Sequence, residues 1–231
     1  MKLLRRSFFQ CLMGVILAAP LAATAEPVLT PMLQGEYAIP NLGIAKNLIR
    51  DYVKSGKYNE ETSYVARRAR AFLEQRLQRP VDGKPAIIFD VDETALSNFP
   101  HIVEMDFGYI PALWNTWVDQ AKAPAIDGAL DLYRYARSKG VSVIFITGRN
   151  QNQRTQTENN LRQIGYEGWT EMILRPVGSH DLAETFKAEQ RRRLTQSGYT
   201  ILLNLGDQQS DLIGGYSESV FKLPNPMYWV P

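Results

Sequence analysis

The run Pro85-Ala86-Ile87-Ile88-Phe89-Asp90-Val91-Asp92 is a short apolar segment that ends in two acidic residues. Two further segments have the same form: residues 141–147 end at Thr147 and residues 200–206 are followed by Asp207. Weaker segments of this kind lie at 171–174 and 219–223. Strands that are apolar along their whole length are buried on both faces, which is typical of a parallel sheet.

Helical patterns separate these segments, at about residues 127–139, 151–164 and 182–197. The first two end at a glycine and a glycine follows the third, as is common at the ends of helices. Alternating strands and helices predict an α/β fold with a doubly wound parallel sheet. Residues 41–79 add two helices, the first capped by Asn41 and broken by Gly56.

Polar residues follow the apolar segments at the point where each predicted strand ends. They are Asp90, Asp92, Thr147, Asp207 and Asp211. Ligands of open α/β sheets bind at the carboxyl ends of the strands, so we expect these side chains to converge. Carboxylates so close together raise one another's pKa unless a cation neutralises them. Oxygen ligands without His or Cys favour a hard ion, and Mg²⁺ fits better than Ca²⁺.

Three groups are suited to binding an anion near these acids. Thr147 offers a hydroxyl, the Gly148 amide can be approached closely because glycine has no side chain, and Lys187 lies near the start of a predicted helix. Together with Mg²⁺, such groups balance the charge on the oxygens of a phosphoryl group during its transfer. A carboxylate at a strand end can then attack phosphorus and form an aspartyl-phosphate.

Phe89-Asp90-Val91-Asp92-Glu93-Thr94 resembles motif I of the haloacid dehalogenase (HAD) superfamily, whose phosphatases carry Asp-x-Asp-x-Thr. The residues 147–149 are similar to motif II, Lys187 to motif III, and Gly206-Asp207-x-x-x-Asp211 to motif IV. The longer sequences of residues 92–98 and 206–212 resemble the acid phosphatase branch, subfamily IIIB. That branch includes bacterial lipoprotein acid phosphatases and plant acid phosphatase and vegetative storage proteins.

The resemblance implies a HAD-like, Rossmann-type fold with a small helical cap, and a Mg²⁺-dependent phosphatase mechanism. Asp90 would be the nucleophile and a metal ligand. Asp92 would be the general acid and later the base, with its backbone carbonyl on the metal. Asp207 would bind the metal directly, while Asp211 would act through water or by orienting Lys187.

The same resemblance implies that Thr147, Gly148 and Lys187 hold the phosphoryl group. For Arg149 two interpretations stay open: it contacts the phosphate or substrate, or it pairs structurally with an acid such as Glu93. The presence of the nucleophile favours an active enzyme, because plant storage members of the branch can lack it.

Residues 97–125 lie between motifs I and II and are rich in aromatic side chains. Candidate leaving-group contacts here are His101, Trp114 and Trp117. Trp114 and Trp117 are three residues apart and would share one face of a helix. They would stack on a nucleoside base or another aromatic leaving group, or pack this segment against residues 41–79, which we favour. We expect residues 41–79 and 97–125 to form the helical cap.

The first 25 residues have the pattern of an export signal. Three basic residues precede an apolar stretch at 8–19, and Ala23-Thr24-Ala25 offers a cleavage site. That stretch is shorter than the ~20 residues needed to span a bilayer, although an uncleaved anchor stays an alternative. The Arg5-Arg6 pair leaves the general secretory and twin-arginine routes both open. We therefore expect a signal peptide over 1–25 and a periplasmic or secreted domain over 26–231, without a stable membrane span or the lipidated cysteine of bacterial relatives.

Composition excludes several other classes of protein. The 231 residues are 45% hydrophobic and 22% charged, as in an ordinary globular protein. A single cysteine excludes a disulfide framework and a Cys-rich zinc module. The net charge of +2, which becomes −1 when the three basic residues of the signal are removed, disfavours a nucleic-acid polymer as partner.

These observations predict an exported, Mg²⁺-dependent acid phosphatase that hydrolyses small phosphate monoesters, with nucleoside monophosphates among its substrates. One alternative is a phosphotransferase that uses the same residues and passes the phosphate to an alcohol. The other is a non-catalytic storage or binding relative. Whether the protein forms a homo-oligomer stays open.

Overall fold

A computed structural model describes residues 40–230, so the predicted signal peptide over 1–25 lies outside the described residues. The described part contains one sheet with the strand order β3-β2-β1-β4-β5, and every neighbouring pair is parallel. The strands are β1 (Lys84–Phe89), β2 (Ser142–Asn150), β3 (Glu171–Arg175), β4 (Tyr199–Gly206) and β5 (Ser219–Lys222). The predicted α/β fold with a doubly wound parallel sheet is confirmed.

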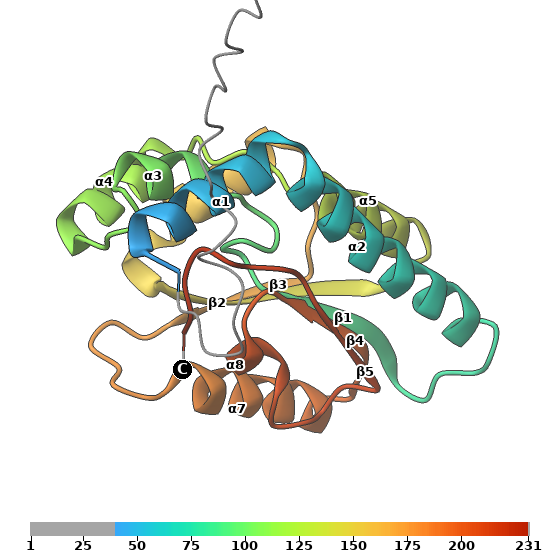
Figure 1. Cartoon of the computed structure of the whole chain (residues 1–231). Coiled ribbons are helices and arrows are strands. Elements are labelled where there is room, and N and C mark those ends of the chain that lie inside the picture. Colours follow the sequence, from blue (N-terminus) through green and yellow to red (C-terminus); the bar gives the residue numbers. More distant parts are fainter. Residues whose placement is uncertain (1–39, 231) are drawn as a thin grey trace, which may run out of the picture. The chain divides into compact units, whose positions relative to one another are not determined.

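The two faces of the sheet form two separate cores, because successive side chains of a strand point to opposite faces. In β1, Ile87 and Phe89 join the larger core, while Ala86 and Ile88 join the smaller one. The larger core is covered by α2 (Lys57–Arg76), α5 (Asp127–Ser138) and α6 (Arg154–Gln163). The smaller core is covered by α7 (Ala183–Gln196), on the opposite side of the sheet from α2 and α5 (Figure 1).

The helices predicted from the sequence are present with small shifts of their ends. The helix expected at 151–164 is divided into a 3-10 turn, η2 (Gln151–Gln153), and α6. In α1 (Leu42–Lys54) the side chain of Asn41 caps the first turn by accepting from the Gly43 amide, at 2.9 Å. Gly56 then adopts a φ of 83°, which glycine tolerates without steric cost, and the chain turns into α2.

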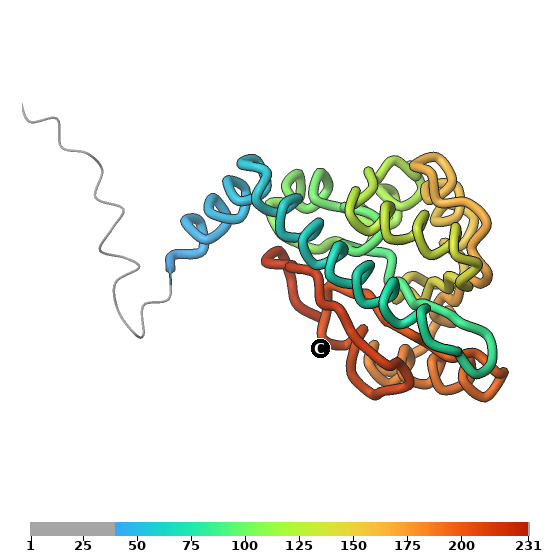
Figure 2. Tube along the Cα trace, turned by 90° about the vertical axis from the view of Figure 1, so that its right-hand side faces the viewer, coloured from blue at the N-terminus to red at the C-terminus, as the bar shows by residue number. Residues whose placement is uncertain are grey.

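The two N-terminal helices differ in what they contact. No residue of α1 is buried, whereas α2 buries Ala69 and Leu73 in the larger core. Phe72 of α2 also contacts Phe221 of β5, with ring centroids 5.8 Å apart. Figure 2 shows α2 lying beside the C-terminal part of the chain. Within the predicted cap region of residues 41–79, the second helix is therefore part of the layer on the sheet.

Residues 97–125 contain two short helices, α3 (Phe99–Glu104) and α4 (Pro111–Gln120). The loop between them has two consecutive residues with positive φ, Asp106 at 49° and Phe107 at 62°. Lys46 and Arg50 of α1 donate to the Asp106 carboxylate at 2.7 and 2.6 Å, so α1 holds this loop (Figure 1). No helix among the described residues is long and apolar enough to cross a membrane.

Candidate active site

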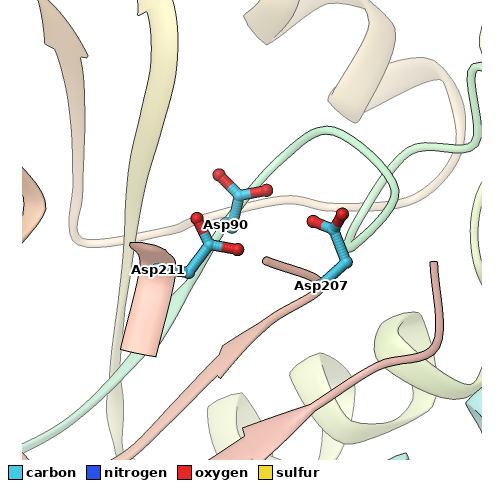
Figure 3. Close-up of side chains that lie close together, drawn as sticks. All are labelled: Asp90, Asp207 and Asp211. Atoms are coloured by element: carbon cyan, nitrogen blue, oxygen red, sulfur yellow. The ribbon is translucent and has the colours of Figure 1, made fainter. Parts of the chain in front are cut away.

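Three acidic side chains meet at the carboxyl edge of the sheet. Asp90 follows β1, Asp207 follows β4, and Asp211 lies in the short helix α8 (Gln209–Leu212). One carboxylate oxygen from each lies within 4.8 Å of the others, and all three residues are buried (Figure 3). β1 and β4 are neighbours, so the residues that follow them are brought together by the strand order. Gly206 is needed here, because a Cβ at this position would clash with the side chain of Asp211.

Lys187, on α7, connects two of these acids. Its Nζ donates to Asp90 Oδ1 and to Asp211 Oδ1, each at 2.5 Å, and the ammonium group is buried. Lys187 lies in the second turn of α7, which positions it through the packing of Phe186 against the sheet. The other oxygen of Asp211 accepts from the Gln208 backbone amide at 2.8 Å. Asp211 is thus fixed between the loop after β4 and the lysine.

Two of the buried acids, Asp90 and Asp207, hold their protons more tightly than free carboxylic acids do. Burial raises the pKa of Asp90 well above its ordinary value, and the charges of Asp211 and Asp207 add to this while Lys187 opposes it. Burial and the charge of Asp211 raise the pKa of Asp207 to about 7. For Lys187 the two carboxylates outweigh the effect of burial, so its pKa is raised and it stays charged.

The donor atoms of this cluster fit a divalent metal ion. Asp90, Asp207 and Asp211 offer only carboxylate oxygens, which suit a hard cation. Lys187 supplies one positive charge to three acids, and a bound dication would compensate the rest. Asp207 is oriented by three donors: Thr94 Oγ1 at 3.1 Å, Gln208 Nε2 at 2.6 Å and Asn225 Nδ2 at 2.7 Å. The sequence analysis gave none of these three donors a role.

Asp92, the second acid of motif I, faces Arg149. The guanidinium donates from Nη2 to Asp92 Oδ1 at 2.6 Å and from Nε to Asp92 Oδ2 at 3.1 Å. Arg149 Nη1 also donates to Thr157 Oγ1 at 3.1 Å, and this side chain is almost fully buried. The acid that pairs with Arg149 is therefore Asp92 and not Glu93, the example that the sequence suggested.

Glu93 has a left-handed backbone conformation, with a φ of 53°, and binds other partners than Arg149. Its carboxylate accepts from the Asn98 amide at 2.5 Å, from Asn98 Nδ2 at 3.1 Å and from Tyr228 Oη at 2.7 Å. Burial, and then the charge of Asp92, raise the pKa of Glu93 to about 7, although these donors oppose the rise. Sequence reasoning missed Asn98 and Tyr228, although Asn98 ends the run 92–98 that carried the family resemblance.

A cavity of about 480 Å³ opens beside these acids. Its lining includes the acids Asp90, Asp92, Asp207 and Asp211, together with Gly148, Arg149 and Lys187. Thr147 is fully buried, and its hydroxyl accepts from the Arg149 amide at 3.1 Å. The structure thus brings residues of all four motifs to the cavity, although Thr147 itself is not part of the lining, and the individual roles stay predictions.

Aromatic side chains also line the cavity. They include Trp114 and His101, which the sequence analysis proposed, and Tyr109, Tyr228 and Trp229, which it did not. Trp117 instead is buried, stacks on His101 with centroids 5.5 Å apart, and donates from Nε1 to Asn98 Oδ1 at 2.8 Å. The sequence pattern could not separate Trp114 from Trp117, because the direction of α4 decides which of them reaches the cavity.

Comparison with known proteins identifies the family. Residues 38–231 match the family described as HAD superfamily, subfamily IIIB (acid phosphatase). The chain belongs to this family. As a member of HAD subfamily IIIB it is a phosphoric monoester hydrolase, which confirms the resemblance and the enzyme class predicted from the motifs.

Relatives of this acid phosphatase occur in plants and bacteria. It is 35% identical over 187 residues to acid phosphatase 1 of Solanum lycopersicum, covering 79% of this chain and 73% of that one. It is 32% identical over 190 residues to vegetative storage protein 2 of Arabidopsis thaliana, covering 80% and 72%. The class C acid phosphatase of Bacillus anthracis has the same fold, with a TM-score of 0.68, 28% identity, and coverage of 81% and 85%.

Proposed function

We propose that this acid phosphatase is an exported, Mg²⁺-dependent phosphomonoesterase that works through an aspartyl-phosphate on Asp90. The observation that carries the proposal is the contact of Lys187 with both Asp90 and Asp211 inside the buried carboxylate cluster. A charged lysine beside a strand-end carboxylate can hold the oxygens of a phosphoryl group while that carboxylate attacks. An ion pair with a purely structural role needs one acid, whereas Lys187 contacts Asp90 and Asp211 and a third acid, Asp207, lies in the same cluster.

In the first step, a carboxylate oxygen of Asp90 forms a bond to phosphorus and the bond between phosphorus and the leaving oxygen breaks. Asp92 delivers its proton to that oxygen. Lys187 and the amide of Gly148 hold the phosphoryl oxygens. The Thr147 hydroxyl, which is buried and accepts from the Arg149 amide, would have to turn toward the cavity to join them. Asp90, Asp207 and the backbone carbonyl of Asp92 would hold Mg²⁺, which would supply positive charge near the phosphoryl group.

In the second step, Asp92 removes a proton from water as the water oxygen attacks phosphorus. The bond between Asp90 and phosphorus breaks, inorganic phosphate leaves, and both carboxyl groups return to their starting state. Asp92 needs access to the outer part of the cavity for both steps, and its side chain is the least buried of the acids at the site, at 20% exposure.

The substrates that we propose are small phosphate monoesters, including nucleoside monophosphates. The cavity is lined both by buried charged groups such as Asp90 and Lys187 and by aromatic groups, of which Tyr109 and Trp229 are exposed. This combination suits a phosphate joined to a planar leaving group. The Bacillus anthracis relative has been solved with bound tungstate, at 28% identity and a TM-score of 0.69. Tungstate is a tetrahedral oxyanion like phosphate, so we expect it to compete with substrate here.

Non-catalytic function is the second candidate, because two relatives are named vegetative storage proteins. This chain retains Asp90 and its contact with Lys187, and an intact nucleophile favours turnover. A storage protein would fold and bind anions without releasing phosphate.

The test is hydrolysis of p-nitrophenyl phosphate by residues 26–231, with Mg²⁺ and with EDTA, beside Asp90→Asn. We expect Mg²⁺-dependent turnover and a loss of at least about 10⁴-fold in the variant, since the nucleophile is removed. Asp119→Asn, an exposed acid on α4, is the matched control and should keep its activity. A folded, metal-loaded wild type without turnover from pH 4 to 9 would contradict the proposal.

Export is tested separately, by the N-terminal sequence of the protein recovered outside the cytoplasm. We expect it to begin at Glu26, after cleavage behind Ala25. Recovery of the whole chain with Met1 in a membrane fraction would favour the uncleaved anchor instead.

A further inference from the structure

Asn98 lies at the start of α3, between the turn after β1 and the indole of Trp117. Its side chain is fully buried, and both its amide nitrogen and its amide oxygen have hydrogen-bond partners. Nδ2 donates to Asp92 Oδ1 at 2.9 Å and to Glu93 Oε2 at 3.1 Å, while Oδ1 accepts from Trp117 Nε1 at 2.8 Å. One amide thus joins the two neighbouring acids of motif I to helix α4.

The chemistry of these partners fixes the orientation of the amide. An indole N–H can only donate, and an ionised carboxylate can only accept. Rotating the amide of Asn98 by 180° would place its oxygen against two carboxylates and its NH₂ against the indole N–H. The indole of Trp117 and the two carboxylates therefore require the same orientation, with the NH₂ group facing Asp92, although Trp117 itself does not reach Asp92.

Asp92 is held from two directions. Arg149 donates to both carboxylate oxygens, and the guanidinium is itself buried and bonded to Thr157 Oγ1. Asn98 binds Oδ1 from a second direction and is itself locked by Trp117. The fork of Arg149 aligns the carboxylate with the guanidinium, and the amide of Asn98 adds a donor from a different element of the chain, which restricts movement of Oδ1 further.

We propose that Asn98 is a positioning residue for Asp92, and that Trp117 acts through Asn98 to set the direction in which Asp92 meets the leaving group. The proposal rests on the role of Asp92 as general acid and base given above. A general acid must lie within hydrogen-bond reach of the oxygen that it protonates. A displaced Asp92 slows the departure of a poor leaving group and has little effect on one that departs without a proton.

The experiment compares two substrates in Asn98→Ala and Trp117→Phe. Glycerol 2-phosphate has an alkoxide leaving group that needs the proton, while p-nitrophenyl phosphate has a good leaving group. In Asn98→Ala we expect kcat/KM to fall about tenfold to hundredfold for glycerol 2-phosphate, because a general acid contributes on the order of 10²–10⁴-fold. For p-nitrophenyl phosphate we expect less than about threefold.

Trp117→Phe keeps an aromatic ring in the core and removes the N–H that orients Asn98, together with part of the indole that packs in the core and stacks on His101. It should change the ratio of the two kcat/KM values in the same direction, by a smaller factor. Thr116→Val is the matched control, because Thr116 is exposed on the same helix. Melting temperatures of all variants show whether the fold is kept, and if Asn98→Ala does not fold, the ratio in Trp117→Phe decides.

Equal losses for both substrates in a folded variant would overturn the proposal, because they would show a general defect of the site. An unchanged ratio in folded Trp117→Phe would overturn the part assigned to Trp117, and it would overturn the whole proposal where Asn98→Ala is unfolded. Failure of the proposed function has a different result: the wild type would turn over neither substrate, or Asp90→Asn would retain activity.

Discussion

The phosphate side of the cavity and its leaving-group side are built from different parts of the chain. Asp90, Asp207, Asp211 and Lys187 lie directly after strands or inside helices that pack on the sheet. The leaving-group side consists mainly of connections, namely the turn at 92–98, the loop between α3 and α4, and the C-terminal segment 224–230, together with the two short helices α3 and α4. One side is positioned by the fold itself, the other by hydrogen bonds between loops.

The two sides also differ in their electrostatics. On the phosphate side, buried acids with raised pKa values surround one buried ammonium group. Hydrogen bonds of this kind are strong, and breaking one leaves a buried charge without a partner. On the leaving-group side, Tyr109 and Trp229 are largely exposed. We therefore expect changes on the phosphate side to affect both stability and activity, and changes at the mouth to affect mainly the choice of substrate.

Lys187→Met should have the largest effect, because it removes the charge while keeping the length of the side chain. We expect at least about a hundredfold loss of kcat, and a loss of stability of about 3–5 kcal/mol without metal, as for one partner of a buried ion pair. Initial rates and urea denaturation in EDTA measure the two effects. Lys57→Met, at an exposed lysine, is the control. A variant as stable and active as the wild type would show that the two sides do not differ as argued.

The second prediction concerns pH and metal. Asp207 and Glu93 have pKa values raised to about 7 in the folded protein, whereas free carboxylic acids ionise near pH 4. Between these values the folded state holds protons that the unfolded state has lost, so stability falls as pH rises. We expect metal-free protein to melt at a lower temperature at pH 8 than at pH 5.

Bound Mg²⁺ favours the ionised acids and should reverse much of this loss. Its effect on the melting temperature should therefore be larger at pH 8 than at pH 5. Thermal unfolding with EDTA and with Mg²⁺ at both pH values measures it. An equal or larger effect of Mg²⁺ at pH 5 would contradict a metal site on the phosphate side.

The same comparison explains what the sequence could predict. Apolar runs that end in Asp90, Thr147 and Asp207 identify parallel strands, and parallel strands place their ends at one edge whatever the loops do. The phosphate side follows from that pattern. Asn225 and Tyr228 could not be found in this way, because their contacts with Asp207 and Glu93 depend on the path of the C-terminal segment.

Arg149 and Trp117 show the limit at the level of single side chains. From the sequence, Arg149 is expected either to contact substrate or to pair with an acid such as Glu93. In the structure that acid is Asp92, while Glu93 adopts a positive φ. No pattern of residue types predicts that a glutamate will adopt a positive φ. Trp117 is three residues from Trp114, and residues with this spacing share one face of a helix. In the structure, however, the indole N–H of Trp117 donates to the buried Asn98.

The third prediction is a smaller effect at the mouth of the cavity. Trp114 lines the cavity, and the Cζ atom of Arg149 lies over its indole ring, 5.6 Å from the ring centroid. Stacking of a base on an aromatic ring contributes about 1–3 kcal/mol. Trp114→Ala should therefore lower kcat/KM for adenosine monophosphate by about tenfold and leave the value for glycerol 2-phosphate within twofold. Equal losses for both substrates would favour the packing role of this tryptophan.

The smallest effect is expected for Asp106→Asn, in the loop between α3 and α4. Asparagine tolerates the positive φ of this position, so the change removes only the charge that Lys46 and Arg50 bind. These pairs are exposed at the carboxylate and contribute little to stability, and the melting temperature should hardly change.

The loop also carries Phe107 and Tyr109 to the cavity, so we expect KM for adenosine monophosphate to rise about threefold with kcat unchanged. Salt weakens exposed ion pairs; the wild type should therefore approach the variant's KM in 1 M salt, while the variant changes less. If salt raises KM equally in both proteins, α1 does not position the leaving-group side through Asp106.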